Sequence, residues 1–545
     1  MRIDTIFTNA RIRTLDPERP TARSIGTLNG RIVGFDDDLH GVQTDRVVDL
    51  DDQPVLPGFH DAHHHLSLTG FRLASLNVRP WAVNSLAELY AAVREYADGL
   101  APDAWVRGSG YDQNFLEGHP TADELDRAAG GRPVILEHVS GHMIVANTRA
   151  FELAGYPRRE GYPDISGGGI PRDADGRPLG LLQESAMSPI YALVRPMELD
   201  DVQRHLQLAS DEALRYGLTS VTEPGIGEIR MLGNNPLDYH AYQTAVEKRM
   251  LRVRTTLMPY ITVLHPFTAL PDKEVLGLDL GIRTGLGDDM LRVGPVKIVA
   301  DGSFIGRSAA MHACFHGESD NFGVLLHEPE QLRDYIVGAH RAGWTVATHA
   351  IGDRAITHVL DAIEEAQRVA PRPDVRHRIE HFALASDDDI ARAARLGVIP
   401  VPQGVFLSDF GDGMAAAVSD DRRDDIYRVK SLADAGIVLN GSTDSPVSDA
   451  NPLVSLRDMV LRRTGSGAVL GERERVSIDE AVRAYTYGSA YAVSQEGSKG
   501  MLKTGMLADF IALSDDLYEI APERIAEQQV TTTVVGGVVE FGDVG

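Results

Sequence analysis

The sequence predicts an α/β fold in which a (β/α)8 barrel of the TIM type carries a small β-sandwich and an inserted subdomain. Two observations lead to this prediction. Short apolar runs recur through the middle of the chain, and each is followed by polar residues and then by a helical stretch, as in repeated βα units. Segments rich in strand-forming residues flank that region at both ends of the chain.

The two ends of the chain predict the β-sandwich. Residues 1–57 contain short β segments, and Asn29-Gly30 between two of them is a strong hairpin signal. Residues 501–545 are again rich in β segments and include a Gly-Gly turn. We therefore expect one small sheet domain assembled from both termini.

The middle of the chain contains eight apolar runs that fit barrel strands. They lie at residues 54–60, 219–222, 252–258, 294–299, 344–348, 378–380, 398–401 and 437–440. This number favours a closed barrel, and a doubly wound open sheet is the structural alternative. No Gly-x-Gly-x-x-Gly turn follows a strand to support a dinucleotide site. We assign residues 58–455 to the barrel and 456–500 to its helical C-terminal part.

A long insertion, at about residues 70–215, separates the first predicted strand from the second. An insertion at the catalytic rim of a barrel commonly forms a lid or a specificity subdomain. A purely decorative role is the alternative.

The bulk composition limits the classes of partner. The chain has 545 residues and is 43% hydrophobic, enough to bury a large core divided among two or three structural units. Lys and Arg total 53 against 79 Asp and Glu, a formal net charge of -26. This charge argues against nucleic acid or an anionic membrane as partner, because both would repel it. We expect a small-molecule substrate.

The sequence also favours a cytoplasmic protein. Cys314 is the only cysteine, so neither an intrachain disulfide nor a thiolate metal cluster can form. No run approaches the roughly 18 apolar residues of a membrane-spanning helix. The first residues lack the charged and apolar pattern of a signal peptide, so we expect none.

The strongest chemical signal is a histidine cluster just after the first predicted strand. In an extended backbone, His63 and His65 point to the same side, about 7 Å apart. Two imidazoles aimed at one point are an efficient way to hold a divalent metal. Because His60 and His64 crowd the same stretch, a histidine-rich surface loop is the alternative.

Four more candidate ligands stand in or after later strands. Lys297 lies within the fourth strand, His349 ends the fifth, His381 ends the sixth and Asp444 follows the eighth. Each alone has an ordinary explanation, such as a snorkelling lysine, a hydrogen-bonded rim histidine or a turn aspartate. Their joint order at successive strand ends instead predicts a metal centre.

These motifs resemble the amidohydrolase superfamily of metal-dependent hydrolases. Within it, the chain is similar to the YtcJ-like and N-substituted formamide deformylase-like branch, amidohydrolase type 3. The similarity runs almost from end to end. It is carried by the motifs at residues 9–12, 57–65, 300–309, 349–353, 378–381, 485–486 and 505–509.

The resemblance implies a binuclear metal centre. His63, His65 and Asp444 would bind the more buried metal, and His349 and His381 would bind the second. Lys297 would bridge the two as an N-carboxylated lysine, since a desolvated amine can capture carbon dioxide to give an anionic ligand. Two Zn2+ ions per chain are expected from the imidazole and oxygen donors, with iron, manganese and nickel as alternatives.

The same resemblance implies hydrolysis of a C–N bond of the amide or formamide type, with Asp444 as the catalytic proton acceptor and donor. A mononuclear deaminase is one alternative. Deaminases of this superfamily place a glutamate three residues after the fifth-strand histidine, where this chain has Gly352. An esterase or lactonase on the same centre, and a catalytically dead scaffold, are the others.

Four further residues are candidate substrate contacts. Arg307 follows the fourth strand and could hold a carbonyl or carboxylate, or form a surface salt bridge instead. His142, Tyr111 and Asp112 lie in the insertion and are expected to reach the site. By family habit we also expect a homodimer.

Overall fold

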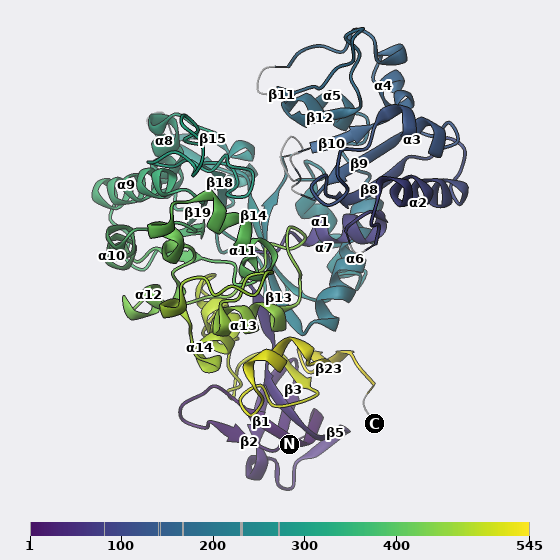
Figure 1. Cartoon of the computed structure of the whole chain (residues 1–545). Coiled ribbons are helices and arrows are strands. Elements are labelled where there is room, and N and C mark those ends of the chain that lie inside the picture. Colours follow the sequence, from purple (N-terminus) through teal and green to yellow (C-terminus); the bar gives the residue numbers. More distant parts are fainter. Residues whose placement is uncertain are drawn as a thin grey trace. The chain divides into compact units, whose positions relative to one another are not determined.

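The computed structural model describes residues 2–80, 82–139, 141, 143–165, 168–228, 233–270 and 273–543 (Figure 1). The chain divides into two compact units. The first comprises Met1–Leu66, Ser210–Glu228 and Tyr242–Gly545, and the second comprises Ser67–Ala209 and Ile229–Ala241. The chain passes between them within α1 (Leu66–Ala74), α6 (Leu199–Arg215) and α7 (Asp238–Glu247).

The first unit contains two parallel sheets of four strands each. One has the order β17-β14-β13-β6, with β6 (Phe59–Asp61), β13 (Leu218–Ile226), β14 (Arg254–Pro259) and β17 (Leu291–Val293). The other has the order β18-β19-β20-β21, with β18 (Val296–Val299), β19 (Val346–Ala350), β20 (Arg378–His381) and β21 (Ile399–Val401). Nearly every residue in these strands is buried, as expected for a parallel sheet covered on both faces.

Parallel bridges link the two sheets into a ring. Tyr260, just after β14, pairs with Lys297 of β18. On the other side Gln403, just after β21, pairs with Ser442. The amide of Ala62 then donates to the carbonyl of Gly441 at 2.9 Å, which joins this last segment to β6. The arrangement is that of the predicted barrel.

The segment that closes the ring is not a regular strand. We predicted a strand at 437–440, but those residues have no strand pairing. The physical reason is that the Gly441 amide donates to the carbonyl of Ala484 at 3.0 Å, and the Asn440 side chain, not its backbone, bonds Pro400 at 2.8 Å. A backbone group that already has such a partner is not available to pair with a neighbouring strand.

Two glycines explain where other strands differ from the prediction. The expected strand 54–60 divides at Gly58, where a Cβ would lie 2.3 Å from the Thr219 side chain. Residues before Gly58 belong to the terminal sheet and those after it to the barrel. Of the expected strand 294–299, only the last four residues form a strand, β18. Gly294-Pro295 separate it from β17, which ends before the predicted range, because proline offers no amide to the ladder.

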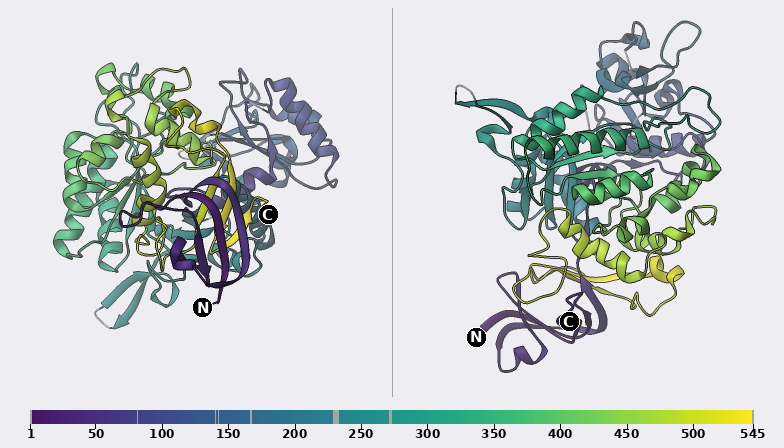
Figure 2. Two further views of the ribbon diagram at one scale, coloured as in Figure 1. Left: turned by 90° about the horizontal axis from the view of Figure 1, so that it is seen from below. Right: turned by 90° about the vertical axis from the view of Figure 1, so that its left-hand side faces the viewer.

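Amphipathic helices follow the strands of the second sheet. The first three, α8 (Pro329–Arg341), α9 (Asp353–Val369) and α10 (Asp387–Leu396), pack in sequence along its outer side (Figures 1 and 2). The helices that follow are α11 (Phe406–Ala417), α12 (Val429–Asp434), α13 (Pro452–Leu461), α14 (Ile478–Arg483) and α15 (Ser489–Tyr491). The ends of α10 show why they form there. Ser386 caps its first turn in a capping box with Asp389, and Gly397 ends it with a φ of 64°.

Strands from both termini form one sheet in the order β24-β23-β22-β5-β1-β3-β4, with β2 paired to β1. The strands are β1 (Arg2–Arg13), β2 (Thr21–Ala22), β3 (Ile25–Leu28), β4 (Arg31–Phe35), β5 (Gln43–Pro57), β22 (Phe510–Leu513), β23 (Val530–Val535) and β24 (Val538–Phe541). Phe7 and Phe510 meet edge to face in its core at 4.8 Å. Asn29 and Gly30 both have positive φ, at 51° and 77°, so the predicted hairpin turn is present.

The second unit holds a separate sheet in the order β11-β12-β10-β9-β8-β7. Its strands are β7 (Leu76–Asn77), β8 (Val106–Tyr111), β9 (Val134–His138), β10 (Met143–Ala146), β11 (Gly168–Gly169) and β12 (Leu181–Glu184). The helices α2 (Leu86–Asp98), α3 (Ala122–Ala128), α4 (Thr148–Leu153) and α5 (Ser188–Tyr191) accompany it. The predicted insertion thus has a sheet and a core of its own.

A two-stranded hairpin, β15 (His265–Leu270) and β16 (Lys273–Gly277), projects from the first unit (Figure 2). Across the described part of the chain, no helix is both long enough and apolar enough to cross a bilayer.

Candidate metal centre

The six predicted metal ligands lie in or just after barrel strands, and five of them are almost fully buried. His63 and His65 follow β6, Lys297 lies in β18, and His381 ends β20. Asp444 follows the segment that closes the ring. His349, in β19, is the sixth and retains 17% side-chain exposure.

His63, His65 and Asp444 converge on one point. The Nε2 atoms of both histidines lie 3.3 Å from Asp444 Oδ1. One ligand atom from each of the three residues lies within 4.8 Å of the others. Two imidazole nitrogens and a carboxylate oxygen at this separation are a donor set that fits a divalent cation. We call this the first metal position.

His349 and His381 form a second pair beside the first position. Their ring centroids are 4.5 Å apart, and the His381 ring lies 5.1 Å from that of His63. We call this pair the second metal position. Lys297 is 3% exposed and interacts electrostatically with Asp444 and Glu380. The structure therefore brings all six predicted ligands into one neighbourhood.

The outer nitrogens of the histidines show which nitrogen is left for a metal. His63 Nδ1 hydrogen-bonds Glu380, and His381 Nδ1 lies 2.8 Å from Gln403 Oε1. Because an oxygen acceptor holds the hydrogen on Nδ1, the lone pair of each ring is on Nε2. His349 has the opposite orientation, since its Nε2 lies 3.1 Å from the Gly302 carbonyl, so its lone pair is on Nδ1.

The electrostatics of the site favour ionised carboxylates and make Lys297 easier to deprotonate. Burial lowers the pKa of Lys297 to about 8. Burial alone would raise the pKa of Glu380, but the Arg378 guanidinium and His63 hold it well below its usual value. Burial also acts to lower the pKa of His65, yet hydrogen bonds to Asp444 and Glu223 raise it to about 9. The carboxylates that hold this proton on His65 would also attract a metal cation.

Two of the candidate ligands have a left-handed backbone. His381 has a φ of 72° and Asp444 a φ of 60°. Such a conformation costs a residue other than glycine roughly 1–3 kcal/mol and clusters at functional sites. The Asp444 amide donates to the His63 carbonyl at 2.8 Å, which holds the carboxylate against the histidines.

Sequence reasoning did not identify the residues that orient the ligands. They are Asp61, Glu223, Asp301, Arg378, Glu380 and Gln403, each less than 2% exposed. Arg378 and Glu380 stand two residues apart in a short strand between two apolar ones, so a buried ion pair could have been read from the sequence. Gln403 and Glu223 carry no such signal, because single polar residues near strand ends are common.

Asp61 and Asp301 tie neighbouring segments together. Asp61 accepts hydrogen bonds from the His63 amide and from the Thr443 amide, both at 3.1 Å, so it joins the end of β6 to the residue before Asp444. Asp301 accepts from the amides of Ile351 and Gly352 at 3.0 and 2.9 Å. Both carboxylates thus fix backbone that carries a ligand.

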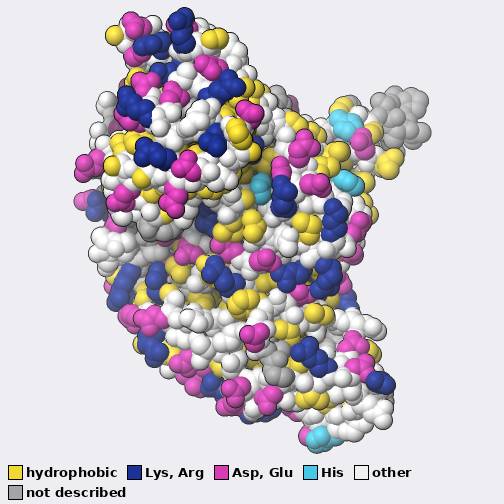
Figure 3. Space-filling model, turned by 90° about the vertical axis from the view of Figure 1, so that its right-hand side faces the viewer, with side chains coloured by type: hydrophobic (Ala, Val, Ile, Leu, Met, Phe, Trp, Pro, Cys, Tyr) yellow, Lys and Arg dark blue, Asp and Glu magenta, His cyan; other side chains and the backbone are white. Residues whose placement is uncertain are grey.

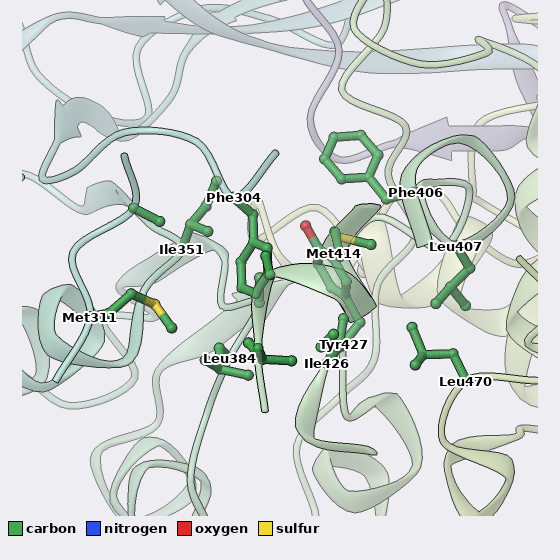
Figure 4. Packing of buried hydrophobic residues seen from close by; sticks show 14 of the residues in the cluster. Phe304, Met311, Ile351, Leu384, Phe406, Leu407, Met414, Ile426, Tyr427 and Leu470 are labelled. Carbon is green, nitrogen blue, oxygen red and sulfur yellow. The ribbon is translucent and has the colours of Figure 1, made fainter. Parts of the chain in front are cut away.

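An apolar cluster lies beside the second metal position (Figure 4). The Phe406 ring stacks on the His381 ring with centroids 6.4 Å apart and planes at 25°. Phe406 also contacts Tyr427, whose hydroxyl donates to Gln403 at 3.3 Å. This side of the centre is therefore walled by hydrophobic side chains from the loops after several strands.

The predicted substrate contacts have other partners in the structure. Arg307 donates to Glu318 at 2.6 Å and to the carbonyl of His316 at 3.0 Å. Tyr111 and Asp112 belong to the second unit, where Tyr111 is buried and lies 3.2 Å from His119. His142 lies outside the described residues. A substrate role for these four residues stays a prediction.

Comparison with known proteins agrees with this geometry. The sequence model of the amidohydrolase family matches residues 46–541. The chain is 29% identical to the putative amidohydrolase YtcJ of Bacillus subtilis, over 91% of this chain and 90% of that protein. It is 27% identical to the N-substituted formamide deformylase of Arthrobacter pascens, over 99% of both chains.

A solved structure supports the fold. An uncharacterized metal-dependent hydrolase from Pyrococcus horikoshii superposes with a TM-score of 0.77 at 25% identity, over 95% of this chain and 99% of that one. The predicted family branch and the predicted fold class are both confirmed by these similarities.

Proposed function

The chain belongs to the amidohydrolase family, and we propose that it is a metal-dependent hydrolase that cleaves an amide or formamide C–N bond in a small molecule. The observation that carries this proposal is the convergence of His63 and His65 Nε2 on Asp444 Oδ1, each at 3.3 Å. The Arthrobacter relative is an N-substituted formamide deformylase, and its name supports the bond type.

The donor set assigns the residues that would hold the metals. The first position would hold one cation through His63, His65 and Asp444, and the second would hold another through His349 and His381. Two Zn2+ ions suit these nitrogen and oxygen donors. Bound cations would lower the pKa of water toward neutrality and polarise the substrate carbonyl.

Lys297 would complete both positions as an N-carboxylated side chain. Its amine is buried and its pKa is lowered to about 8, so it loses its proton near neutral pH far more readily than an exposed lysine does. A neutral amine attacks carbon dioxide, forms a C–N bond and releases one proton, which leaves a carbamate anion. That anion offers two oxygens, one toward each position.

Asp444 is the residue that would move the proton. It would accept a proton from the attacking water and deliver it to the leaving nitrogen. Its support is its place between the two imidazoles and its strained backbone, which fixes the carboxylate. The apolar wall formed by Phe406 and its neighbours would limit water access from that side.

The structure disfavours the deaminase alternative. At Gly352, where a deaminase would carry its glutamate, a Cβ would lie 2.0 Å from the backbone oxygen of Ala310. No side chain fits there without moving the backbone. An esterase or lactonase would use the same centre, so the substrate panel must include esters.

Metal analysis combined with a substrate panel tests the proposal. Purified protein should contain about two equivalents of divalent metal and should hydrolyse members of a panel of N-acyl, N-formyl and cyclic amides. Chelation should abolish the activity and zinc should restore it. A folded protein without metal would contradict the proposal and support a scaffold, whereas cleavage of esters alone would reassign the bond.

A further inference from the structure

The two metal positions differ in what holds their histidines from behind. At the first position a carboxylate faces the outer nitrogen of each ring. Glu380 hydrogen-bonds His63 Nδ1, and Glu223 Oε1 lies 3.6 Å from His65 Nδ1. Both histidines of this position therefore face an anion.

These carboxylates are themselves held in place. Arg378 donates to both oxygens of Glu380 at 2.8 Å, and neither side chain is exposed to solvent. Tyr242 donates its hydroxyl to Glu223 Oε2 at 2.5 Å. A buried carboxylate that is held by such hydrogen bonds keeps its imidazole in one orientation.

At the second position one of the two corresponding acceptors, that of His381, is a neutral amide. Gln403 Nε2 donates to the Val401 carbonyl at 2.9 Å and to Ser442 Oγ at 3.0 Å, which fixes the orientation of its amide. Its Oε1 therefore faces His381 as an uncharged acceptor.

The other histidine of the second position faces a carbonyl and, slightly farther away, a carboxylate. His349 Nε2 lies 3.1 Å from the Gly302 carbonyl and 3.4 Å from Asp301 Oδ1. That carboxylate already accepts backbone hydrogen bonds from Ala310, Ile351 and Gly352. The second position therefore has one carboxylate behind its histidines, where the first position has two.

We propose that the two positions hold metal with unequal affinity, so that the first retains its cation while the second exchanges its cation more readily. A charged acceptor behind an imidazole makes the ring a stronger base and a better ligand than a neutral acceptor does. Asp444 adds an anionic ligand to the first position alone. Glu223 and Glu380 are positioning residues for the tight ion, and Gln403 for the exchangeable one. This inference rests on the proposed function.

Titration of metal-free protein with Zn2+ against a competing chelator tests the inference. Two classes of site should appear, one equivalent each, with dissociation constants separated on the order of 10- to 100-fold. Two equivalents in a single class would overturn the inference and leave the proposed function intact. Folded protein that binds no Zn2+ would overturn both.

Two variants should each weaken Zn2+ binding at a different class of site. Glu223→Gln keeps the shape and the Tyr242 contact but removes the charge, so it should weaken the tight class on the order of 10-fold. Gln403→Met removes the acceptor for His381 and should weaken only the exchangeable class. Gln331→Met on exposed α8 makes the same chemical change far from the site, and it should alter neither.

Which class of site each variant weakens distinguishes a residue that positions one histidine from a residue that is needed for the structure in general. A merely structural effect would lower the affinity of both classes together and would overturn the assignment of that residue. A Gln403→Met protein that weakens the tight class would contradict the assignment as well. If Gln403→Met does not fold, Glu223→Gln and the wild-type titration still decide the question.

Discussion

At the scale of single residues, Asp444 has the most demanding role. It lies 3.3 Å from two imidazoles, and its left-handed φ of 60° holds it there. Asp444→Asn keeps an oxygen ligand but cannot accept a proton. We expect the variant to retain much of its metal and to lose kcat on the order of 10²–10⁴-fold. Parallel measurement of metal content and kcat checks this, and a near-wild-type rate would reject the role.

Lys297 gives a second prediction at this scale. Lys297→Ala would remove the proposed bridging anion, so kcat should fall on the order of 100-fold or more, and the second equivalent of metal should bind more weakly. Added acetate or propionate can occupy the vacated space and should restore part of the activity. Assays with and without the short carboxylate make the comparison. Full activity of the variant would exclude a bridging role for Lys297.

Most of the candidate ligands could be predicted from the sequence because they stand at or just after the end of an apolar run, and Lys297 because it is a charged residue inside one. The residues behind them could not, because their contacts span long sequence separations. His63 pairs with Glu380, and His65 with Glu223, only once the ring of strands is closed. Strict alternation along β20 would place Glu380 and His381 on opposite faces, yet both lie beside His63, and the φ of 72° at His381 marks this departure.

At the scale of elements, a buried histidine pair links the starts of β19 and β20. The Val346 amide donates to His377 Nδ1 at 3.1 Å, so His377 Nε2 carries the hydrogen that bonds His340 Nδ1 at 2.8 Å. His340 Nε2 then donates to the Ala370 carbonyl at 2.7 Å. This chain of bonds requires both rings to be neutral.

The pair predicts a loss of stability in acid. Burial lowers the pKa of His377 well below its usual value, helped by His340 and Arg372, and burial lowers the pKa of His340 as well. The unfolded chain therefore binds more protons than the folded one as the pH falls below about 6.5. Stability is present above that pH and is lost below it. His340→Gln should show a smaller fall in Tm from pH 7.5 to 5.5 than wild type, and an equal fall would contradict this explanation.

The start of α9 gives a second prediction for an element. Gly352→Ala would place a Cβ 2.0 Å from the Ala310 oxygen. We expect a loss of about 1–3 kcal/mol in the free energy of unfolding. Gly338→Ala in α8 meets nothing within 4 Å and should instead stabilise by about 0.5–1 kcal/mol. Denaturant titration of both variants makes the test, and equal effects would show that the close approach is unimportant.

Element boundaries show where sequence patterns fail. Apolar periodicity predicted most of the strands, since buried parallel strands are continuous hydrophobic runs. It could not reveal that Gly58 separates two sheets. It also could not reveal that residues 437–440, just before the point where the ring closes, pair with no other strand. Both outcomes depend on contacts with distant segments, Thr219 in one case and Ala484 in the other.

At the scale of the whole molecule, the charge is consistent with a small-molecule enzyme. The net charge is -26, and on the face in Figure 3 acidic and basic side chains lie interspersed. The candidate ligands and the carboxylates that contact them lie in or just after the barrel strands, where nearly all of them are buried. We therefore expect the reaction to take place at the rim of the barrel.

Anomalous X-ray diffraction at the zinc edge from crystals of the zinc-loaded protein tests the central claim most directly. We expect two peaks of anomalous density in each chain. One should lie about 2.0–2.1 Å from Nε2 of both His63 and His65, and the other at a similar distance from His349 Nδ1 and His381 Nε2. No peak among these side chains, or zinc bound elsewhere in the chain, would contradict it.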